Sequence, residues 1–447
     1  MSISIKLNFY FLMLIPITIF LIQHFSDLQT LNASIPKPGS LPLLKDRSVN
    51  LSDSRLKIEI FATGLKNPTN MAFLDSGDAL VLEKLNGTVR KIVNGKLLPE
   101  PLLDVNVATY DTRGMLGIAV AKNETAGKQY IFLYYTEARD GQGDGEDKCF
   151  SPSKCIPGYL PNGNRLYRYE LSDNGSKLIN QKLIFSWPPL KRADHNGGEL
   201  IVGPDNNLYL VVGDAGNKSE VLNNKNSSIK IEAMGGILAF SHNGGPIFSN
   251  GLLGPENPLN KFYAYGVRNG FGLDFDPITG KLWDTENGPK YGDEINLVEP
   301  GFNSGWRVVQ GLSVLKPGFN ITKLEDFGGR GIYSDPELEW NYTIAPTAIK
   351  FLNSDNYGKK YENDIFVGSA SGYLYHFDLN SNRTGLDLPK PLQDKIVDNY
   401  EDEELNVIFG RNFGVISDIE VGPDGYLYVV AFSRGEIYRI IPTNSLH

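Results

Sequence analysis

The residues with the clearest chemical potential lie in one short turn, residues 191–198, with the sequence KRADHNGG. Of the five histidines in the chain, only His195 and His242 are flanked by the Gly and Asn residues of turns. A neutral imidazole accepts a hydroxyl proton near neutral pH, and an adjacent carboxylate such as Asp194 orients the ring or raises its basicity. The turn indicates a general base at His195, although an Asp-His pair also occurs in plain solvated turns.

Two later Gly-rich segments complement such a base. Arg268 and Asn269 lie in the turn AYGVRNGFG, where a guanidinium and an amide can reach an oxygen-rich or anionic ligand. The segment TENGPKYGDEIN, which starts at Thr285, offers carboxylates, an amide and turn carbonyls, all hard oxygen ligands that suit calcium. Its spacing is not that of an EF-hand, so the pattern alone leaves calcium open. Asp214, which follows the run LVVG, either belongs to this chemistry or is a turn residue.

These segments connect short apolar runs that repeat along the chain. Each copy reads as an apolar strand, a turn of Pro, Asp, Gly or Asn, a second apolar strand and a Gly turn into a third. Apolar residues at every second position, as at Leu208, Leu210 and Val212, have the period of half-buried strands and not of helices. Copies begin near six positions: Asn70, Gly114, Glu199, Gly272, Glu362 and Ile419.

A repeated unit of three or four antiparallel strands is typical of propeller blades, none of which buries its faces alone. We therefore expect an all-β fold, a six-bladed β-propeller over residues 55–442. The strand around Leu56, Ile58 and Ile60 should pair with residues 437–441 and close the ring, because this pairing removes exposed edges. A β-sandwich is the structural alternative.

The composition fits this architecture and limits the partners. The 447 residues include 47 Gly and 26 Pro, which supply many tight turns. A formal net charge of −9 provides no basic stripe, which argues against nucleic acid as a partner and favours small or neutral ligands.

The amino-terminal residues indicate export. A charged start and an apolar run over residues 9–22 predict a signal peptide or signal-anchor within residues 1–24, with a buried helix as the alternative. The polar, Pro-containing residues 25–54 should form a linker. We expect an extracytoplasmic protein, either secreted or held by an amino-terminal membrane anchor at the outer face of the cell membrane.

Sequons and cysteines agree with export. Cys149 and Cys155, the only cysteines, enclose a short polar loop without the neighbouring ligands of a zinc site, so we expect a local disulfide, with free thiols as the alternative. N-x-S/T sequons begin at ten asparagines: Asn32, Asn50, Asn86, Asn123, Asn174, Asn217, Asn226, Asn320, Asn341 and Asn382.

Six motifs resemble, in chain order, those of the soluble quinoprotein glucose dehydrogenase and aldose/sorbosone sugar dehydrogenase family: NPTNMAFLDSGDALVLEKLNGTVRKI, RGMLGIAV, DHNGGELIVGPDNNLYLVVGDAG, YGVRNGFGLDFDP, ENGPKYGDEINLVEPGFNSGW and VGPDGYLYV. The resemblance covers nearly everything after Arg55. It implies a six-bladed propeller that binds pyrroloquinoline quinone (PQQ) and calcium at its axis. It also implies oxidation of the anomeric hydroxyl of an aldose sugar to a lactone, with an external electron acceptor.

The resemblance gives roles to residues in the turns described above. It makes His195 the general base, with Asp194 beside it and Asp214 in support. It implies that Arg268 and Asn269 contact substrate and cofactor oxygens. Its metal positions are four residues: the Gly288 and Pro289 carbonyls and the nearby acidic Asp293 and Glu294.

The chain departs from the family where the cofactor is held. Three replacements occur: Thr112 and Arg113 stand in place of a glutamine, Ser369 and Ser371 in place of a lysine, and Val415, Ser417 and Asp418 in place of an Arg-x-Arg-Asp cluster. Arg411 lies near the last cluster, out of register, and joins Thr112 and Arg113 as a candidate contact of the cofactor. Charge-assisted hydrogen bonds contribute about 1.5–3 kcal/mol each, so these replacements should weaken the binding of a trianionic quinone.

Functions from different classes therefore compete. The first is a sugar dehydrogenase that uses PQQ and calcium. The second is a non-catalytic extracellular propeller that binds glycans or a protein partner. A calcium-dependent hydrolytic propeller, similar to a lactonase, is a third.

Overall fold

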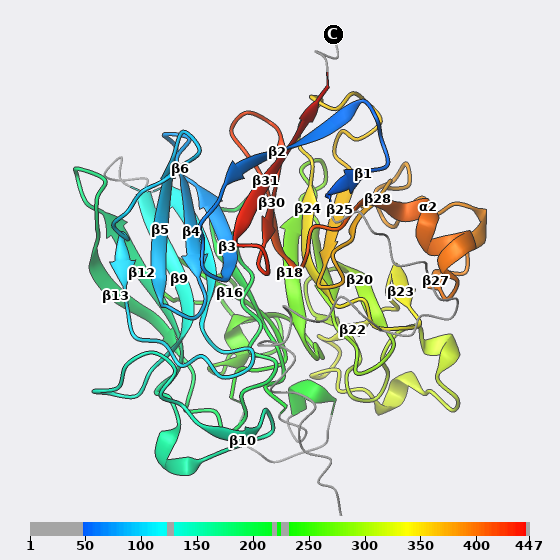
Figure 1. Cartoon of the computed structure of the whole chain (residues 1–447). Helices are drawn as coiled ribbons and strands as arrows, with labels where there is room; N and C mark the ends of the chain where they lie inside the picture. The colour runs from blue at the N-terminus through cyan, green and yellow to red at the C-terminus, as the bar shows by residue number, and fades with distance from the viewer. Residues whose placement is uncertain (1–47, 123–128, 217–220, 225–231, 444–447) are drawn as a thin grey trace, which may run out of the picture. The chain divides into compact units, whose positions relative to one another are not determined.

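A computed structural model describes residues 48–122, 129–216, 221–224 and 232–443 (Figure 1). In this part of the chain, six sheets of four to six strands hold nearly all the strands. A separate hairpin consists of β10 (Cys149–Ser151) and β11 (Lys154–Cys155). The prediction of an all-β, six-bladed propeller is confirmed.

The first three blades run from an innermost strand outward. Blade one contains β3 (Pro68–Phe73), β4 (Ala79–Glu83), β5 (Thr88–Val93) and β6 (Lys96–Leu97), with β7 (Leu103–Asp104) beside β5. Blade two contains β8 (Met115–Lys122), β9 (Gln129–Glu137), β12 (Gly163–Leu171) and β13 (Leu178–Ser186). Blade three contains β14 (Leu200–Val202), β15 (Leu208–Val212), β16 (Gly236–Phe240), β17 (Phe262–Tyr265), β21 (Phe302–Asn303) and β22 (Ile332–Tyr333).

The other three blades follow the same plan. Blade four contains β18 (Gly270–Phe275), β19 (Leu282–Glu286), β20 (Asp293–Val298), β23 (Leu338–Trp340) and β27 (Ile396–Val397). Blade five contains β24 (Pro346–Phe351), β25 (Ile365–Ser369), β26 (Leu374–Phe377), β28 (Ile408–Arg411) and β1 (Asn50–Leu51), with the short helix α2 (Leu405–Val407) before β28. Blade six contains β29 (Ile416–Val421), β30 (Leu427–Ala431), β31 (Glu436–Pro442) and β2 (Leu56–Ala62).

The ring closes within blade six. The innermost strands contact one another in the cyclic order β3, β8, β14, β18, β24, β29 and β3 again. The outermost strand of blade six, β2, pairs with β31, with Ile58 opposite Ile440 and Ile60 opposite Tyr438 (Figure 1, blue beside red). The predicted pairing of the first long strand with the last is confirmed.

Six apolar clusters of buried residues fill the six seams between neighbouring blades. In β15, Leu208, Leu210 and Val212 pack toward blade two, whereas Tyr209 and Val211 pack toward blade four. Every residue of this strand is buried, so the prediction of half-buried strands is wrong here. Alternate side chains of β15 therefore lie in two different seams, and neither set faces solvent.

Polar contacts tie the innermost strands together inside the ring. Lys350 of β24 places its Nζ 2.9 Å from Glu420 Oε2 of β29 and 3.6 Å from Asp274 Oδ1 of β18. Although burial favours the neutral amine, these two carboxylates raise the pKa of Lys350 above its ordinary value. Asn70 of β3 donates to Glu199, just before β14, at 2.9 Å. Charge and amide contacts therefore connect inner strands of different blades.

Residues 48–54, which the composition assigned to the linker, contribute to the propeller. The strand β1 pairs with β28, with Asn50 opposite Arg411. Val49 and Leu51 pack against the apolar cluster between blades five and six. The propeller therefore begins several residues earlier than the sequence indicated, because Val49 and Leu51 are packed in the apolar seam between blades five and six.

The predicted signal peptide or signal-anchor, residues 1–24, and most of the linker lie outside the described residues. Among the residues that are described, no helix has the length and apolar character needed to cross a membrane. Five of the sequon asparagines in the described segments are exposed: Asn50, Asn174, Asn320, Asn341 and Asn382. Glycosylation stays a prediction.

Paired substitutions in β31 and β2 test the closure of the ring in blade six. Ile440 is fully buried in β31, whereas Ile60 on β2 is 58% exposed. Ile440→Ala should lower the free energy of unfolding by about 2–5 kcal/mol, because it leaves a cavity in the seam. Ile60→Ala should change it by about 0.5 kcal/mol or less. Urea unfolding followed by tryptophan fluorescence measures both, and equal losses would contradict the described closure.

Candidate active site

The candidate residues meet at one end of the ring because of strand order. The three inner strands of a blade are antiparallel neighbours, as β14, β15 and β16 are, so the loop before the first of them and the loop between the second and third share an end. His195 lies before β14, Asp214 after β15, and Arg268 before β18. The Asp214 backbone N–H donates to the Arg268 carbonyl at 2.8 Å, so the loops of blades three and four are directly joined.

His195 lies in a tightly constrained turn. Its φ of 57° is in the left-handed region, and two glycines follow it. At Gly197, with φ 68°, a Cβ would lie 2.5 Å from the Val211 carbonyl oxygen, so this turn requires glycine. The buried Asn196 fixes the turn from below, since its amide donates to the Ala193 carbonyl at 2.7 Å. The imidazole is thus held by backbone geometry as well as by its own contacts.

Asp214 orients the imidazole. His195 Nδ1 lies 2.6 Å from Asp214 Oδ1, and only 2% of the Asp214 side chain is exposed. Trp306 Nε1–H donates to the other carboxylate oxygen at 2.9 Å, and the Gly216 N–H donates to Oδ1 at 2.7 Å. Although burial alone would raise it, the bonds from His195, Trp306 and Gly216 hold the pKa of Asp214 below its usual value. An ionised Asp214 accepts from Nδ1–H, which leaves the Nε2 lone pair for a ligand.

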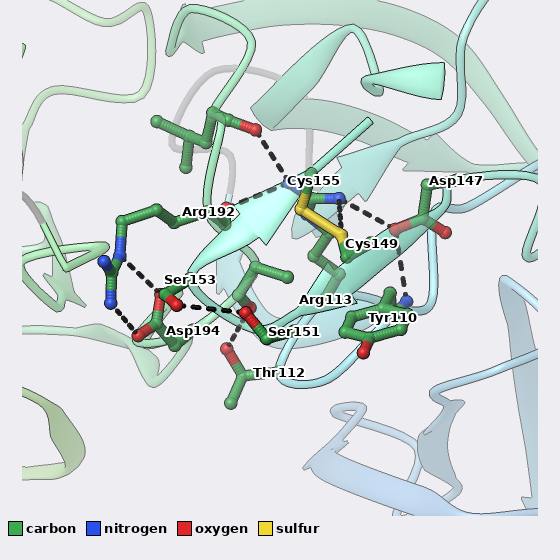
Figure 2. The surroundings of a disulfide bond; sticks show 12 residues. Tyr110, Thr112, Arg113, Asp147, Cys149, Ser151, Ser153, Cys155, Arg192 and Asp194 are labelled. Carbon is green, nitrogen blue, oxygen red and sulfur yellow. Dashed lines mark hydrogen bonds and ion pairs between the residues drawn. A yellow bond between two sulfur atoms is a disulfide. The ribbon is translucent and has the colours of Figure 1, made fainter. Parts of the chain in front are cut away.

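Asp194, the carboxylate adjacent in sequence, has a different partner. Its two oxygens accept from Arg192 Nε at 3.0 Å and Nη2 at 2.7 Å (Figure 2). The expectation that the neighbour in sequence orients His195 is therefore replaced by the contact with Asp214. Asp194 and His195 are consecutive in the turn and direct their side chains differently, so Asp194 reaches Arg192. Asp214 reaches the imidazole from the loop after β15 of the same blade.

Arg113 is part of the framework under the turn. Its side chain is fully buried, with Nη1 2.8 Å from Asp147 Oδ2 and Nη2 bonded to the Leu190 and Arg192 carbonyls at 2.7 and 2.9 Å (Figure 2). Burial lowers its pKa, and the Asp147 carboxylate opposes that shift. Its position does not fit the predicted contact with a cofactor, because both terminal nitrogens are already bonded within the protein.

Thr112 and the disulfide hold the same framework. Thr112 Oγ1–H donates to the Ala193 carbonyl at 2.9 Å, so this hydroxyl supports the turn and does not face a ligand. Cys149 and Cys155 form the predicted disulfide (Figure 2). The hairpin that it closes accepts a backbone bond from Ala193 N–H at the Pro152 carbonyl, 2.7 Å away.

Arg268 and Asn269 lie close to the His195–Asp214 pair. The Arg268 guanidinium lies 5.4 Å from the centre of the Trp306 ring, the same ring that donates to Asp214. Burial lowers the pKa of Arg268, while Asp214 and neighbouring carboxylates oppose this. Asn269 is buried, and no described residue donates to its Oδ1. A buried acceptor without a donor costs free energy, and a ligand hydroxyl would satisfy it.

The predicted metal turn contains protein–protein contacts. Arg268 Nη1 donates to the Asn287 and Gly288 carbonyls at 2.8 and 2.9 Å, so the Gly288 oxygen is in use. Pro289 is exposed. Asp293 accepts from the backbone N–H groups of Gly288, Ile344 and Ala345, each at 2.8 Å, and burial raises its pKa to about 6. Asp293 therefore holds the turn and does not present free oxygens.

Three glutamates lie in register across blade four. Glu286 is opposite Glu294, and Glu294 is opposite Glu339, all at most 1% exposed. Burial raises the pKa of Glu286 and of Glu339 to about 7 and that of Glu294 well above its usual value. None forms an ion pair with a described lysine or arginine. Three nearby oxygens lack a donor in the described structure: Glu339 Oε1, Asp284 Oδ2 and Gln310 Oε1.

These glutamates carry the type of oxygen that a hard divalent cation binds, but their oxygens do not all converge on one point. Calcium prefers carboxylate and amide oxygens, and a buried carboxylate needs a compensating charge or a proton. Glu339 Oε1 is the carboxylate oxygen of the three glutamates that lacks a donor. The Glu294 oxygens accept from Gln310, Gly311 and Asn296, so Glu294 is engaged within the protein, as Asp293 is.

The remaining expected cofactor positions are engaged elsewhere. Ser369 and Ser371 bond to each other at 2.8 Å, and Ser417 Oγ–H donates to the Pro68 carbonyl at 2.8 Å. Asp418 accepts from the Met71 N–H at 2.7 Å. Arg411 lies on β28, the fourth strand of blade five, opposite Asn50. These residues bring no positive charge beside His195.

Sequence reasoning missed several polar neighbours of this region. Trp306 lies in the motif GFNSGW, but nothing in the motif indicates its bond to Asp214. Glu339 has a readable signal, since a charged residue between Leu338 and Trp340 in a strand is unusual. Lys84, at 6% exposure, donates to the Asp111 carbonyl at 2.7 Å, and burial lowers its pKa to about 8.

Comparison with known protein families finds a match along most of the chain. The family model described as glucose/sorbosone dehydrogenase matches residues 65–439. The chain is 26% identical over 400 residues to an aldose sugar dehydrogenase of Escherichia coli, which covers 87% of this chain and 94% of that protein. It is 31% identical over 261 residues to quinoprotein glucose dehydrogenase B of Acinetobacter calcoaceticus, which covers 55% of this chain and 50% of that protein.

Solved structures show the same fold. The soluble aldose sugar dehydrogenase of Escherichia coli, in its apo-form, matches with a TM-score of 0.63 and 24% identity, over 87% of this chain and 99% of that chain. The PQQ-bound form of an aldose sugar dehydrogenase from Streptomyces coelicolor matches with a TM-score of 0.61 and 22% identity, over the same shares. At these identities the likeness concerns the fold alone.

Substitution of Arg113 tests its structural role. Arg113→Met should lower the free energy of unfolding by about 3–5 kcal/mol, because it leaves the buried Asp147 carboxylate without its cationic partner. The control Arg192→Met breaks the partly exposed pair with Asp194 and should cost about 1 kcal/mol or less. Chemical denaturation measures both. A stable Arg113→Met variant that loses only ligand binding would restore the cofactor role.

Proposed function

The chain belongs to the glucose/sorbosone dehydrogenase family, and we propose that it oxidises the anomeric hydroxyl of an aldose to a lactone, with His195 as general base. One observation carries the proposal: buried, ionised Asp214 lies 2.6 Å from His195 Nδ1 and leaves Nε2 without a hydrogen bond to any described residue. A positioned imidazole of this kind can accept the proton of a bound hydroxyl.

The chain's own residues divide the work around that proton. Asp214 stabilises the imidazolium that forms when Nε2 accepts the proton, and Trp306 keeps Asp214 ionised by donating to its second oxygen. Asn269 offers a buried acceptor for a further sugar hydroxyl. Arg268, held over the Trp306 ring, directs its guanidinium toward electron-rich oxygens.

PQQ would supply the two-electron acceptor for the hydrogen that leaves the anomeric carbon, and an external acceptor would then reoxidise it. Arg268 is the residue best placed to hold its oxygens. Arg113, Ser369 and Ser417 are bonded within the protein, so the grip on this cofactor is weaker than the family pattern implies.

Calcium fits blade four. The buried carboxylates of Glu294 and Glu339 have no cationic partner in the described structure, and Glu339 Oε1 lacks a donor. Bound there, a divalent cation would offset the charge of the carboxylates. It would also limit the motion of the loop that contains Asn287 and Gly288, whose carbonyls accept from Arg268.

A non-catalytic role is the second candidate. The observation in its favour is that three expected cofactor positions are occupied by internal contacts or small hydroxyls. In that case the same end of the propeller would bind a glycan or a protein partner without oxidising it.

The setting that we propose is extracytoplasmic. The disulfide between Cys149 and Cys155 persists in oxidising compartments, and the exposed described sequons are accessible to glycosylation. Secretion or an amino-terminal membrane anchor would both present the propeller outside the cytoplasm.

Reconstitution with PQQ and calcium tests the function. The wild type should reduce a dye in the presence of at least one aldose. His195→Ala and Asp214→Asn should each lower kcat by about two to four orders of magnitude, the usual contribution of a positioned base. Asp194→Asn should have a much smaller effect, because Asp194 pairs with Arg192. Steady-state kinetics with circular dichroism as a check on folding measures these effects.

The contrast between the two carboxylates is the control. Equal losses in Asp194→Asn and Asp214→Asn would contradict the assigned orientation of His195. A folded, calcium-loaded wild type that binds no quinone and oxidises no aldose across a broad panel would favour the non-catalytic role.

A further inference from the structure

A second group of metal-type side chains lies on blade five, at the other end of the ring from His195. Asp364 immediately precedes β25, and His376 and Asp378 lie in and just after β26. The loop before the second strand and the loop after the third strand share the end opposite to the candidate active site. This group is independent of the proposed function.

The β-ladder brings these three side chains together. Ile365 pairs with Phe377 and Phe366 with His376, so Asp364 and Asp378 follow as the next opposite residues. Side chains two residues apart in a strand share a face, which puts His376 on the face of Asp378. Their potential ligand atoms all lie within 4.8 Å of one another.

We propose that Asp364, His376 and Asp378 bind one divalent transition-metal ion, with zinc as the reference ion. His376 Nε2 lies 3.0 Å from Asp364 Oδ2 and 3.7 Å from Asp378 Oδ1. Two ligand atoms at zinc bond lengths of about 2.0–2.1 Å from a tetrahedral centre are about 3.3 Å apart. The two observed separations bracket this value, so small side-chain adjustments would form the coordination shell.

The imidazole is already aimed at the carboxylates. Aromatic rings enclose it: Tyr361 edge-on at 4.9 Å, Phe366 at 5.1 Å and Phe409 at 6.3 Å between ring centres. This apolar surround limits rotation of the ring and keeps Nε2 toward Asp364 and Asp378. An ordered ligand loses less entropy on binding the ion.

Charge and access also fit. The two carboxylates outnumber the one lysine that acts on Asp378, Lys360, whose Nζ lies 3.1 Å from the Tyr361 hydroxyl. The Asp364 and His376 side chains are 11% and 13% exposed, whereas Asp378 is 56% exposed and leaves a path for the ion and a coordinated water. A nitrogen ligand favours a transition metal over calcium.

Calorimetric titration with zinc chloride tests the inference, with the protein kept saturated in calcium so that the oxygen cluster of blade four does not respond. The wild type should bind zinc with one-to-one stoichiometry at this group. His376→Gln and Asp378→Asn should lose that isotherm. Two controls should keep it: Asp355→Asn, an exposed carboxylate of the same blade, and His195→Ala at the other end of the ring.

Cobalt provides a second readout, because its visible absorption reports nitrogen and oxygen coordination directly. The cobalt spectrum should appear in the wild type and disappear in Asp378→Asn, whose exposed position keeps the fold intact even if His376→Gln does not fold. No zinc isotherm in the wild type, an unchanged affinity in either cluster variant, or loss of binding in His195→Ala would overturn the proposal. The three side chains would then form an ion-pair group only.

Discussion

Burial of both faces of every blade is the constraint on which the other features depend. A strand such as β15 packs one set of side chains into each of two seams, so no blade is stable without both neighbours. The ring must therefore close. The first long strand of the chain, β2, pairs with the last strand, β31, and completes blade six. Closure brings the loops of six blades to one end, where His195, Asp214 and Arg268 meet.

Within that end, the decisive contact joins the loops of one blade. Asp214 is adjacent to His195 in space because the loops before β14 and after β15 share an end, and a bond of 2.6 Å results. Trp306 reaches Asp214 from the loop after β21 and so ties the base to Arg268. The turn that carries His195 is held by polar groups of Thr112, Arg113 and the disulfide hairpin. Because these groups are bonded within the protein, they are not available to bind a ligand.

The sequence predicted the six blades, the closing strands, the disulfide and the grouping of His195 with Arg268, because each has a local pattern or an ordered motif. It could not predict which carboxylate orients His195, since this depends on the directions in which the Asp194 and Asp214 side chains point. It assigned Arg113 to a cofactor because this residue stands where the resembling family has a glutamine, while its burial depends on Asp147 in a distant loop. The alternation in β15 showed a strand but not that both of its faces are buried.

The most direct measurement is the distance between His195 Nε2 and the anomeric oxygen of an aldose in a crystal structure of the calcium- and PQQ-loaded protein. The account predicts a hydrogen bond of about 2.6–3.2 Å, with Nδ1 still bonded to Asp214. A sugar bound elsewhere on the propeller, or one at this end whose anomeric oxygen lies beyond hydrogen-bond reach of His195, would contradict the account.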